Sequence, residues 1–142
     1  MVAHASISDS TLVALDIAPQ IASANVNGTV VDMQGWDGCL YVFNLGAMTS
    51  GATFDARIVG SANANMSGAT NVTNAALTQV TTATPNNCFM IDVYQPSTRY
   101  LRSATMPATA NSYLSSFTQR YRRTGILPAT AAALQTVKVK VN

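Results

Sequence analysis

Charged residues are scarce in this sequence. Only 10% of its 142 residues are Asp, Glu, Lys or Arg, whereas about a quarter is usual. All six acidic residues are aspartates, and glutamate is absent. The surface must therefore consist largely of Thr, Ser, Asn and Ala, and like-charge repulsion does little to keep copies apart. Such a surface indicates a structural role within a multi-copy assembly, and the net charge of +2 is too small to indicate a nucleic-acid partner.

Residues that carry chemistry are equally few. His4 is the only histidine, so no Ser–His–Asp or Cys–His arrangement has a base within the body of the chain. No Cys or His spacing suits zinc, and no phosphate-binding loop is present. Asp32 and Asp37 are the nearest pair of carboxylates; acid–base catalysis and calcium binding stay open for them, and neither is favoured. We predict no enzymatic activity, cofactor or metal.

The two cysteines, Cys39 and Cys88, each lie within an apolar run. The chain shows no secretory signal and no apolar stretch of membrane length, so we expect synthesis in a cytoplasm and no membrane partner. In that compartment both residues are expected to be reduced core thiols. A disulfide stays open if their strands are neighbours.

Alternating and β-branched segments, separated by Gly, Pro and Asn turn signals, predict an all-β protein. The expected strands are 28–33, 38–45, 52–59, 76–81, 87–94, 98–105, 113–121 and 135–141. About eight short strands at this spacing predict a two-sheet antiparallel sandwich that is jelly-roll-like, with little helix. The sole helix candidate is 128–135, which is a short helix or a turn. The apolar run 11–17 is a ninth strand or part of an arm, so we divide the chain into residues 1–20, an N-terminal arm or extra edge strand, and a single sandwich domain, 21–142.

Two connections have particular interest. Residues 60–74 contain almost no core side chains, which predicts a long exposed loop that is mobile or faces a partner, with Asn65 as its candidate contact. Residues 87–102 read as a hairpin that turns at Pro96 and Ser97. In that hairpin Asp92 and Arg99 are diagonal neighbours on one face, within reach of an ion pair.

Arginines supply the other candidate contacts. Arg99 and Arg102 are interpreted as sheet supports or ion-pair partners, with contact to a neighbouring subunit and anion binding as alternatives. Arg120, Arg122 and Arg123 form one short basic cluster. It is a solvated strand end, a contact to an acidic partner surface, or a phosphate site.

Trp36 is the single tryptophan and lies in a turn, within QGWDG. A core-capping aromatic, a subunit contact and a sugar-stacking platform are its three possible roles. A jelly-roll carbohydrate-binding module would use the last of these.

The order VVDMQGWDGCLYVFNLGAMTSGATFDARIVGS, then ALTQV, then CFMIDVYQPSTRYLR resembles small virion proteins of tailed bacteriophages, in particular head decoration, or cement, proteins. The matching segments are 38–46, 50–61 and 92–102, and the resemblance covers residues 28–105. The RYLR element in this order is its most specific part. The family pattern often has Gln or Glu before the serine, where this chain has Val59 and Gly60.

The resemblance implies a jelly-roll-like sandwich, often trimeric, on the outside of a capsid where major capsid subunits meet. The expected partners are the major capsid protein and other copies of the chain, and the expected location is the virion exterior. Another virion position, such as head completion or tail, is the alternative. The candidate subunit or capsid contacts are Trp36, Asn65, Arg99, Arg102, Arg120, Arg122 and Arg123.

Overall fold

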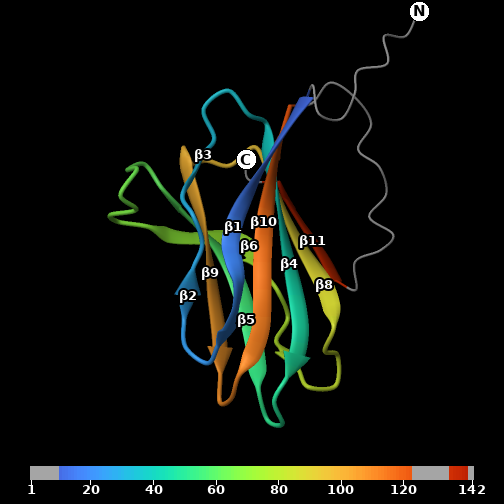
Figure 1. Ribbon diagram of the computed structural model, residues 1–142. Coiled ribbons are helices and arrows are strands. Elements are labelled where there is room, and N and C mark those ends of the chain that lie inside the picture. Colours follow the sequence, from blue (N-terminus) through green and yellow to red (C-terminus); the bar gives the residue numbers. More distant parts are fainter. Residues whose placement is uncertain (1–9, 123–134, 141–142) are drawn as a thin grey trace, which may run out of the picture.

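A computed structural model of the chain describes residues 10–122 and the backbone of 135–140 (Figure 1). The strands are β1 (Thr11–Ala22), β2 (Val26–Asn27), β3 (Val31–Asp32), β4 (Gly38–Met48), β5 (Thr53–Ser61), β6 (Thr70–Ala76), β7 (Val80–Thr81), β8 (Asn87–Tyr94), β9 (Tyr100–Ala108), β10 (Ser112–Tyr121) and β11 (Gln135–Lys140). No helix lies among the described elements. Accordingly, this part of the chain has no helix with the length and hydrophobicity to cross a membrane.

The strands form two sheets that pack face to face, which confirms the predicted all-β sandwich (Figure 1). Sheet A has the order β1-β10-β4-β8-β11. Sheet B has the order β2-β9-β5-β6, with β3 added beside β9 and β7 beside β5. All pairs are antiparallel except β8 with β11, which is parallel.

The strand pairing is nested, as in a jelly roll. The pairs β1–β10, β2–β9, β4–β8 and β5–β6 lie one inside the next along the chain. The chain is therefore arranged as one long hairpin that folds back on itself. Its successive strand pairs lie alternately in sheet A and sheet B. Its centre is the short connection between β5 and β6.

The hairpin predicted for residues 87–102 is wrong. β8 lies in sheet A beside β4, whereas β9 lies in sheet B beside β5. The turn signal at Pro96–Ser97 is real, but the connection there crosses from one sheet to the other. Local alternation marks a strand without specifying its partner, because the partner is set by contacts far away in the sequence.

The loop predicted for residues 60–74 is correct only in its middle. β5 continues to Ser61, and β6 begins at Thr70. β6 is an edge strand whose exposed face carries Thr and Asn, and the alternation signal is weak because its fully buried residue is the small Ala75. The register shift beside β5 includes Asn74, whose φ of 61° is one that asparagine tolerates. The predicted strand 76–81 is correspondingly reduced to the two-residue β7.

The other predicted strands match within a few residues, except that 28–33 contains only β3. The N-terminal apolar run forms β1, an edge strand of sheet A that includes residues on both sides of position 20. Residues 128–134 of the helix candidate lie outside the described residues, and Gln135 begins β11.

The core lies between the sheets and is centred on aromatic side chains. Tyr41 and Phe43 of β4 stack with ring centroids 6.4 Å apart, and Phe43 contacts Phe54 of β5 at 6.2 Å. All three are essentially fully buried, as are Ile91 and Leu101. This contact between β4 and β5 joins the two sheets, because the inward side chains of each strand fill the space that the opposite sheet leaves.

One carboxylate lies inside the sandwich. Asp16 is 6% exposed and accepts hydrogen bonds from Ser103 Oγ (2.6 Å), Ser116 Oγ (2.7 Å) and the Thr29 amide (3.0 Å). A register shift between Leu15 and Ile17 of β1 lets Asp16 and Ile17 both point inward. Asp16 thereby links the edge strand to sheet B through Ser103 of β9.

Candidate interaction site around Trp36

Trp36 lies in a tight turn that the rest of the sandwich holds in place. The Trp36 amide donates to the Met33 carbonyl at 3.0 Å, and Gly35 supplies the positive φ of 79° that such a turn requires. On either side, the Met33 amide donates to the Arg99 carbonyl at 2.8 Å, and the Asp37 amide to the Tyr121 carbonyl at 3.0 Å. The turn between β3 and β4 is therefore fixed to both β9 and β10.

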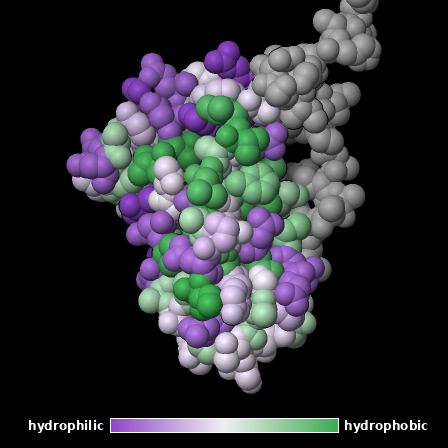
Figure 2. Space-filling model, in the orientation of Figure 1, coloured by the Kyte–Doolittle hydropathy of each residue, from purple (hydrophilic) through white to green (hydrophobic). Residues whose placement is uncertain are grey.

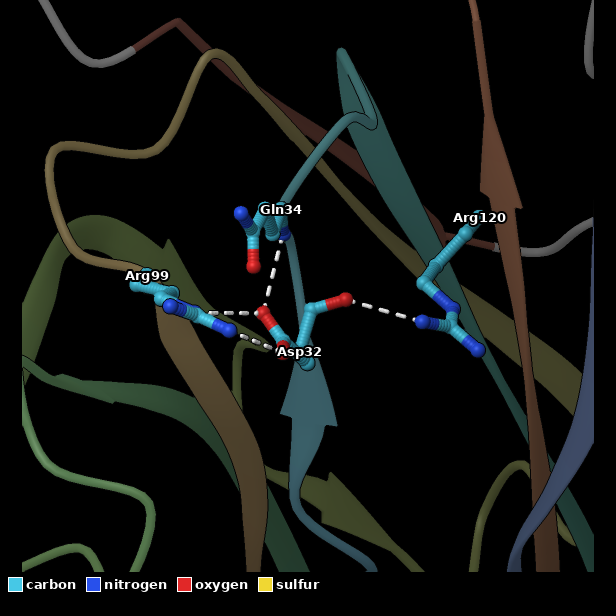
Figure 3. Close-up of polar contacts among 4 residues, drawn as sticks. All are labelled: Asp32, Gln34, Arg99 and Arg120. Atoms are coloured by element: carbon cyan, nitrogen blue, oxygen red, sulfur yellow. Dashed lines mark hydrogen bonds and ion pairs between the residues drawn. The ribbon is translucent and has the colours of Figure 1, made fainter.

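Asp32, at the start of this turn, is the anchor for two arginines (Figure 3). Its carboxylate accepts two parallel bonds from Arg99, from Nε at 2.9 Å and from Nη2 at 2.8 Å, and a third from the Gln34 amide at 3.0 Å. Its carbonyl oxygen accepts a bond from Arg120 Nη1 at 2.8 Å. The Arg99 bonds, followed by the Gln34 amide, lower the pKa of Asp32 to about 2.

Two guanidinium groups lie over the indole ring of Trp36. Arg120 Cζ is 5.3 Å from the ring centroid and Arg122 Cζ is 5.0 Å from it, both within cation–π distance. Trp36 is partly buried and packs against the core, as expected of a capping aromatic. A sugar ring stacked on this indole would have to compete with the two arginines.

We name the group formed by Asp32, Trp36, Arg99, Arg120 and Arg122 the Trp36 cluster. Four of its five members are contact candidates from the sequence, contributed by the β3–β4 turn, the start of β9 and the end of β10. These side chains meet because β3, in sheet B, and the C-terminal end of β10, in sheet A, lie at the same end of the sandwich. The cluster offers one paired acid and three guanidinium groups at a partly exposed aromatic.

The predicted partner of Arg99 is wrong. Arg99 pairs with Asp32 and not with Asp92, because β8 and β9 lie in different sheets. Asp92 is almost fully buried and accepts a bond from the Tyr121 hydroxyl at 2.7 Å. Burial and this bond raise the pKa of Tyr121. Arg99 is nevertheless the ion-pair partner of an aspartate, which is one of the roles predicted for it.

The remaining candidates lie apart from the Trp36 cluster. Arg102 is on the outer face of sheet B, opposite Val59 and diagonal to Arg57. Asn65 is exposed in the connection between β5 and β6, where its Oδ1 accepts a bond from the Ser67 amide at 3.0 Å. Arg123 lies outside the described residues.

The residues considered for metals and disulfides are also placed. Among residues 10–122 and 135–140, no three His, Cys, Asp or Glu side chains gather as metal ligands would. Cys39 and Cys88 form no disulfide; they lie on the paired strands β4 and β8 but not opposite each other. Cys39 is buried as predicted and burial raises its pKa, whereas Cys88 is only partly buried.

We expect Asp32→Asn to reduce the loss of folding stability that the protein shows when the pH falls from 4 to 2. Because the folded-state pKa of Asp32 is lowered to about 2 from 3.8, its ionised form stabilises the fold above pH 4, and this contribution is lost as the pH falls toward 2. Urea unfolding of wild type and variant should therefore differ most above pH 4 and converge near pH 2. The pair is exposed, so the difference should be small at any pH.

Arg99→Gln is the matched control for this experiment. It removes the main donor and leaves the carboxyl group and the Gln34 amide, so it should remove most of the same pH-dependent difference, and the double variant should resemble either single one. A pH dependence of Asp32→Asn that is unchanged in the Arg99→Gln background would show that another group holds the Asp32 carboxylate.

Two surface features escaped sequence reasoning. Arg57 lies on the outer face of sheet B beside Arg102, which only the β5–β9 register shows. Apolar side chains of β1 and β10 are exposed on the outer face of sheet A. For β1 the sequence signal was present, since residues 12–15, LVAL, are apolar at successive positions and not only at alternate ones. No protein-family model matches the chain, and no curated protein matches it at a significant level.

Proposed function

We propose that this chain is a structural protein of a bacteriophage virion, located on the outside of the capsid. It binds neighbouring major capsid subunits and stabilises the shell by bridging them, as a homotrimer. The proposal starts from the sequence resemblance to decoration proteins and assigns the Trp36 cluster as a capsid contact. It assigns no catalytic step to any residue.

The observation that carries this proposal is that one rigid sandwich presents two unlike surfaces. The Trp36 cluster at one end brings Arg99, Arg120 and Arg122 to a partly exposed indole. The outer face of sheet A instead exposes large apolar side chains, such as Leu15 and Tyr113. Arginine and aromatic residues are the types enriched at protein interfaces. One surface can bind a capsid subunit while the other binds another copy of the chain, so an oligomer presents several Trp36 clusters to neighbouring capsid subunits, as bridging requires.

The fold supports the same function by analogy. Nested pairing of eight main strands in two sheets is a jelly-roll-like arrangement, and jelly rolls are common in viral capsid proteins and also in lectins. Because one fold serves many functions, the jelly-roll arrangement supports this function only in combination with the two surfaces described above.

Stabilisation would follow from mass action. A protein that binds only the assembled shell lowers the free energy of that state relative to dissociated subunits. A closed trimer attaches through several contacts at once, so individually weak contacts sum to firm attachment. Arginines whose positions are fixed by Asp32 and Trp36 lose little side-chain freedom on binding, which reduces the entropic cost of each contact.

We expect Arg122→Glu to weaken capsid attachment strongly. Arg122 is exposed at the end of β10, and charge reversal there replaces an attraction to an acidic partner surface with a repulsion. Purified protein would be added to phage heads that lack it, and bound protein measured by co-sedimentation and by its occupancy in electron micrographs. Occupancy should fall about tenfold or more at subsaturating protein, and wild-type binding should weaken with added salt.

Arg57→Glu is the control with the same change of charge. Arg57 is partly exposed on the outer face of sheet B, away from the Trp36 cluster, and its replacement should leave occupancy close to that of wild type. Equal losses for both variants would show that net charge and not the Trp36 cluster controls binding. Heads that bind no wild-type protein would overturn the proposed function.

A further inference from the structure

A patch of apolar side chains is exposed on β1 and β10, along one side of sheet A (Figure 2). Its most exposed members are Leu15 (60%), Val13 (59%), Ile21 (53%) and Tyr113 (52%). Phe117, partly buried, lies directly opposite Leu15. We call these five residues the β1–β10 patch. Single exposed hydrophobic residues are ordinary on protein surfaces, but a contiguous group on one face is a mark of an interaction site.

The patch continues across β10 and β4 without interruption by charge; beyond them, on the same face of β8, Asp92 is almost fully buried and accepts the bond from the Tyr121 hydroxyl. Leu15 lies opposite Phe117, Phe117 opposite Val42 on β4, and Val42 opposite Met90 on β8. Within β1, β4 and β10 the charged residues are Asp16, buried between the sheets, and Arg120, which bonds to the Asp32 carbonyl. No charged side chain of these three strands therefore stands on the outer face.

The opposite face of the sandwich has a different character. The outer face of sheet B carries Arg57 and Arg102 as diagonal neighbours, with Asp55 two residues before Arg57. The Nε atoms of both arginines are buried without a hydrogen-bond partner. Two copies that met through this face would bring guanidinium groups together, which costs energy through like-charge repulsion.

The chemistry of these two faces indicates which kind of partner fits the β1–β10 patch. In a closed symmetric assembly, a patch near the rotation axis meets its own copies, so it must be compatible with itself. An uncharged apolar patch satisfies that condition, since juxtaposed copies repel nowhere and each removes the other from water. The face with Arg57 and Arg102 does not satisfy it.

The size of the patch fits the same conclusion. Four large side chains exposed by more than half leave on the order of 400 Å² of apolar surface in water, within the range of the largest patches on monomers. A stable interface needs about 800 Å² from each partner, and about two thirds of a subunit interface is apolar. The β1–β10 patch with a polar rim therefore supplies what association of identical chains requires.

We propose that a second copy of this chain covers the β1–β10 patch, so that the protein associates with itself through the outer face of sheet A. This inference names the surface for the oligomer in the proposed function. It does not depend on capsid binding, because the contact forms between isolated chains. β1, the edge strand of sheet A, and the adjacent β10 then lie at the subunit interface.

The test is sedimentation velocity of the purified full-length chain over a wide concentration range. Wild type should sediment as a multiple of the 14.9 kDa chain. Leu15→Lys should weaken association by about a hundredfold, because it places a charge where the partner's apolar surface would desolvate it. Val59→Lys, on the outer face of sheet B, introduces the same charge into the same kind of element and should leave the oligomer intact.

Circular dichroism and thermal unfolding would show that each variant keeps its fold. If Leu15→Lys does not fold, Leu15→Thr provides a milder loss of apolar surface with a strand-compatible residue, and its association should be weakened about tenfold. A monomeric wild type at all concentrations would overturn the inference, even if that monomer binds capsids. A folded Leu15→Lys or Leu15→Thr variant that associates as wild type does would overturn it as well.

Discussion

Replacing Asp16 with alanine should destabilise the protein by about 3 kcal/mol at neutral pH. The change leaves three donors, the Ser103 and Ser116 hydroxyls and the Thr29 amide, without their common acceptor inside the sandwich. It also removes the link between edge strand β1 and sheet B. Urea unfolding followed by circular dichroism measures the loss. Asp55→Ala is the control, since Asp55 is partly exposed and accepts a bond from the Gln79 side chain, and should cost well under 1 kcal/mol.

The isosteric Asp16→Asn variant separates shape from charge. Its oxygen can keep the Thr29 bond, and its amide can donate to one serine hydroxyl, so the loss should be smaller than for alanine. Burial raises the pKa of Asp16 above 3.8 despite its hydrogen bonds. Wild type should therefore lose stability relative to Asp16→Asn as the pH rises from about 4 through the raised pKa. A stability difference that is constant with pH would contradict this account of Asp16.

The second large effect is expected at Gly38, the first residue of β4. A methyl group at this position would overlap the ring of Tyr121, which lies opposite Gly38 in the sheet. The ring would have to move and release its hydroxyl from the buried carboxylate of Asp92. Overpacking together with the lost charge-assisted bond should cost Gly38→Ala about 3 kcal/mol, measured by thermal or urea unfolding.

A double-mutant cycle tests the cause of this loss. In a Tyr121→Ala background the ring is absent, so adding Gly38→Ala should cost little more. Tyr121→Phe removes only the hydroxyl and should cost less than Gly38→Ala. If Gly38→Ala is equally harmful with and without the Tyr121 ring, the glycine is required for its backbone and not for the space it leaves.

Much of the secondary structure could be predicted from the sequence. β8 was predicted to the residue and β4, β5, β9 and β10 within three residues at either end. In β4 and β8 the inward side chains are mostly large, and in all five strands buried residues alternate with less buried ones over much of the length. β6 could not be predicted in this way. Its buried face carries Ala75, whose small side chain gives the alternation little amplitude.

The candidate site was predictable in its membership but not in its arrangement. Trp36, Arg99, Arg120 and Arg122 stand out in a sequence with one tryptophan and few charges. Their meeting around Asp32 depends on β3 and β10 reaching the same end of the sandwich. Nothing in residues 32–37 indicates that Arg99 and Arg120 will bind there, since they follow Asp32 by 67 and 88 positions in the chain.

The sequence by itself determined that this chain is an all-β sandwich with few groups capable of catalysis, because composition and two-residue periodicity are properties of each short segment. The tertiary structure alone decided which strands pair, which acid receives Arg99, and which face of sheet A remains apolar and exposed. The physical reason is that a strand's alternation specifies two faces but not its neighbours. Neighbours are chosen by burying both sheets against each other, an energy that only the whole chain can gain.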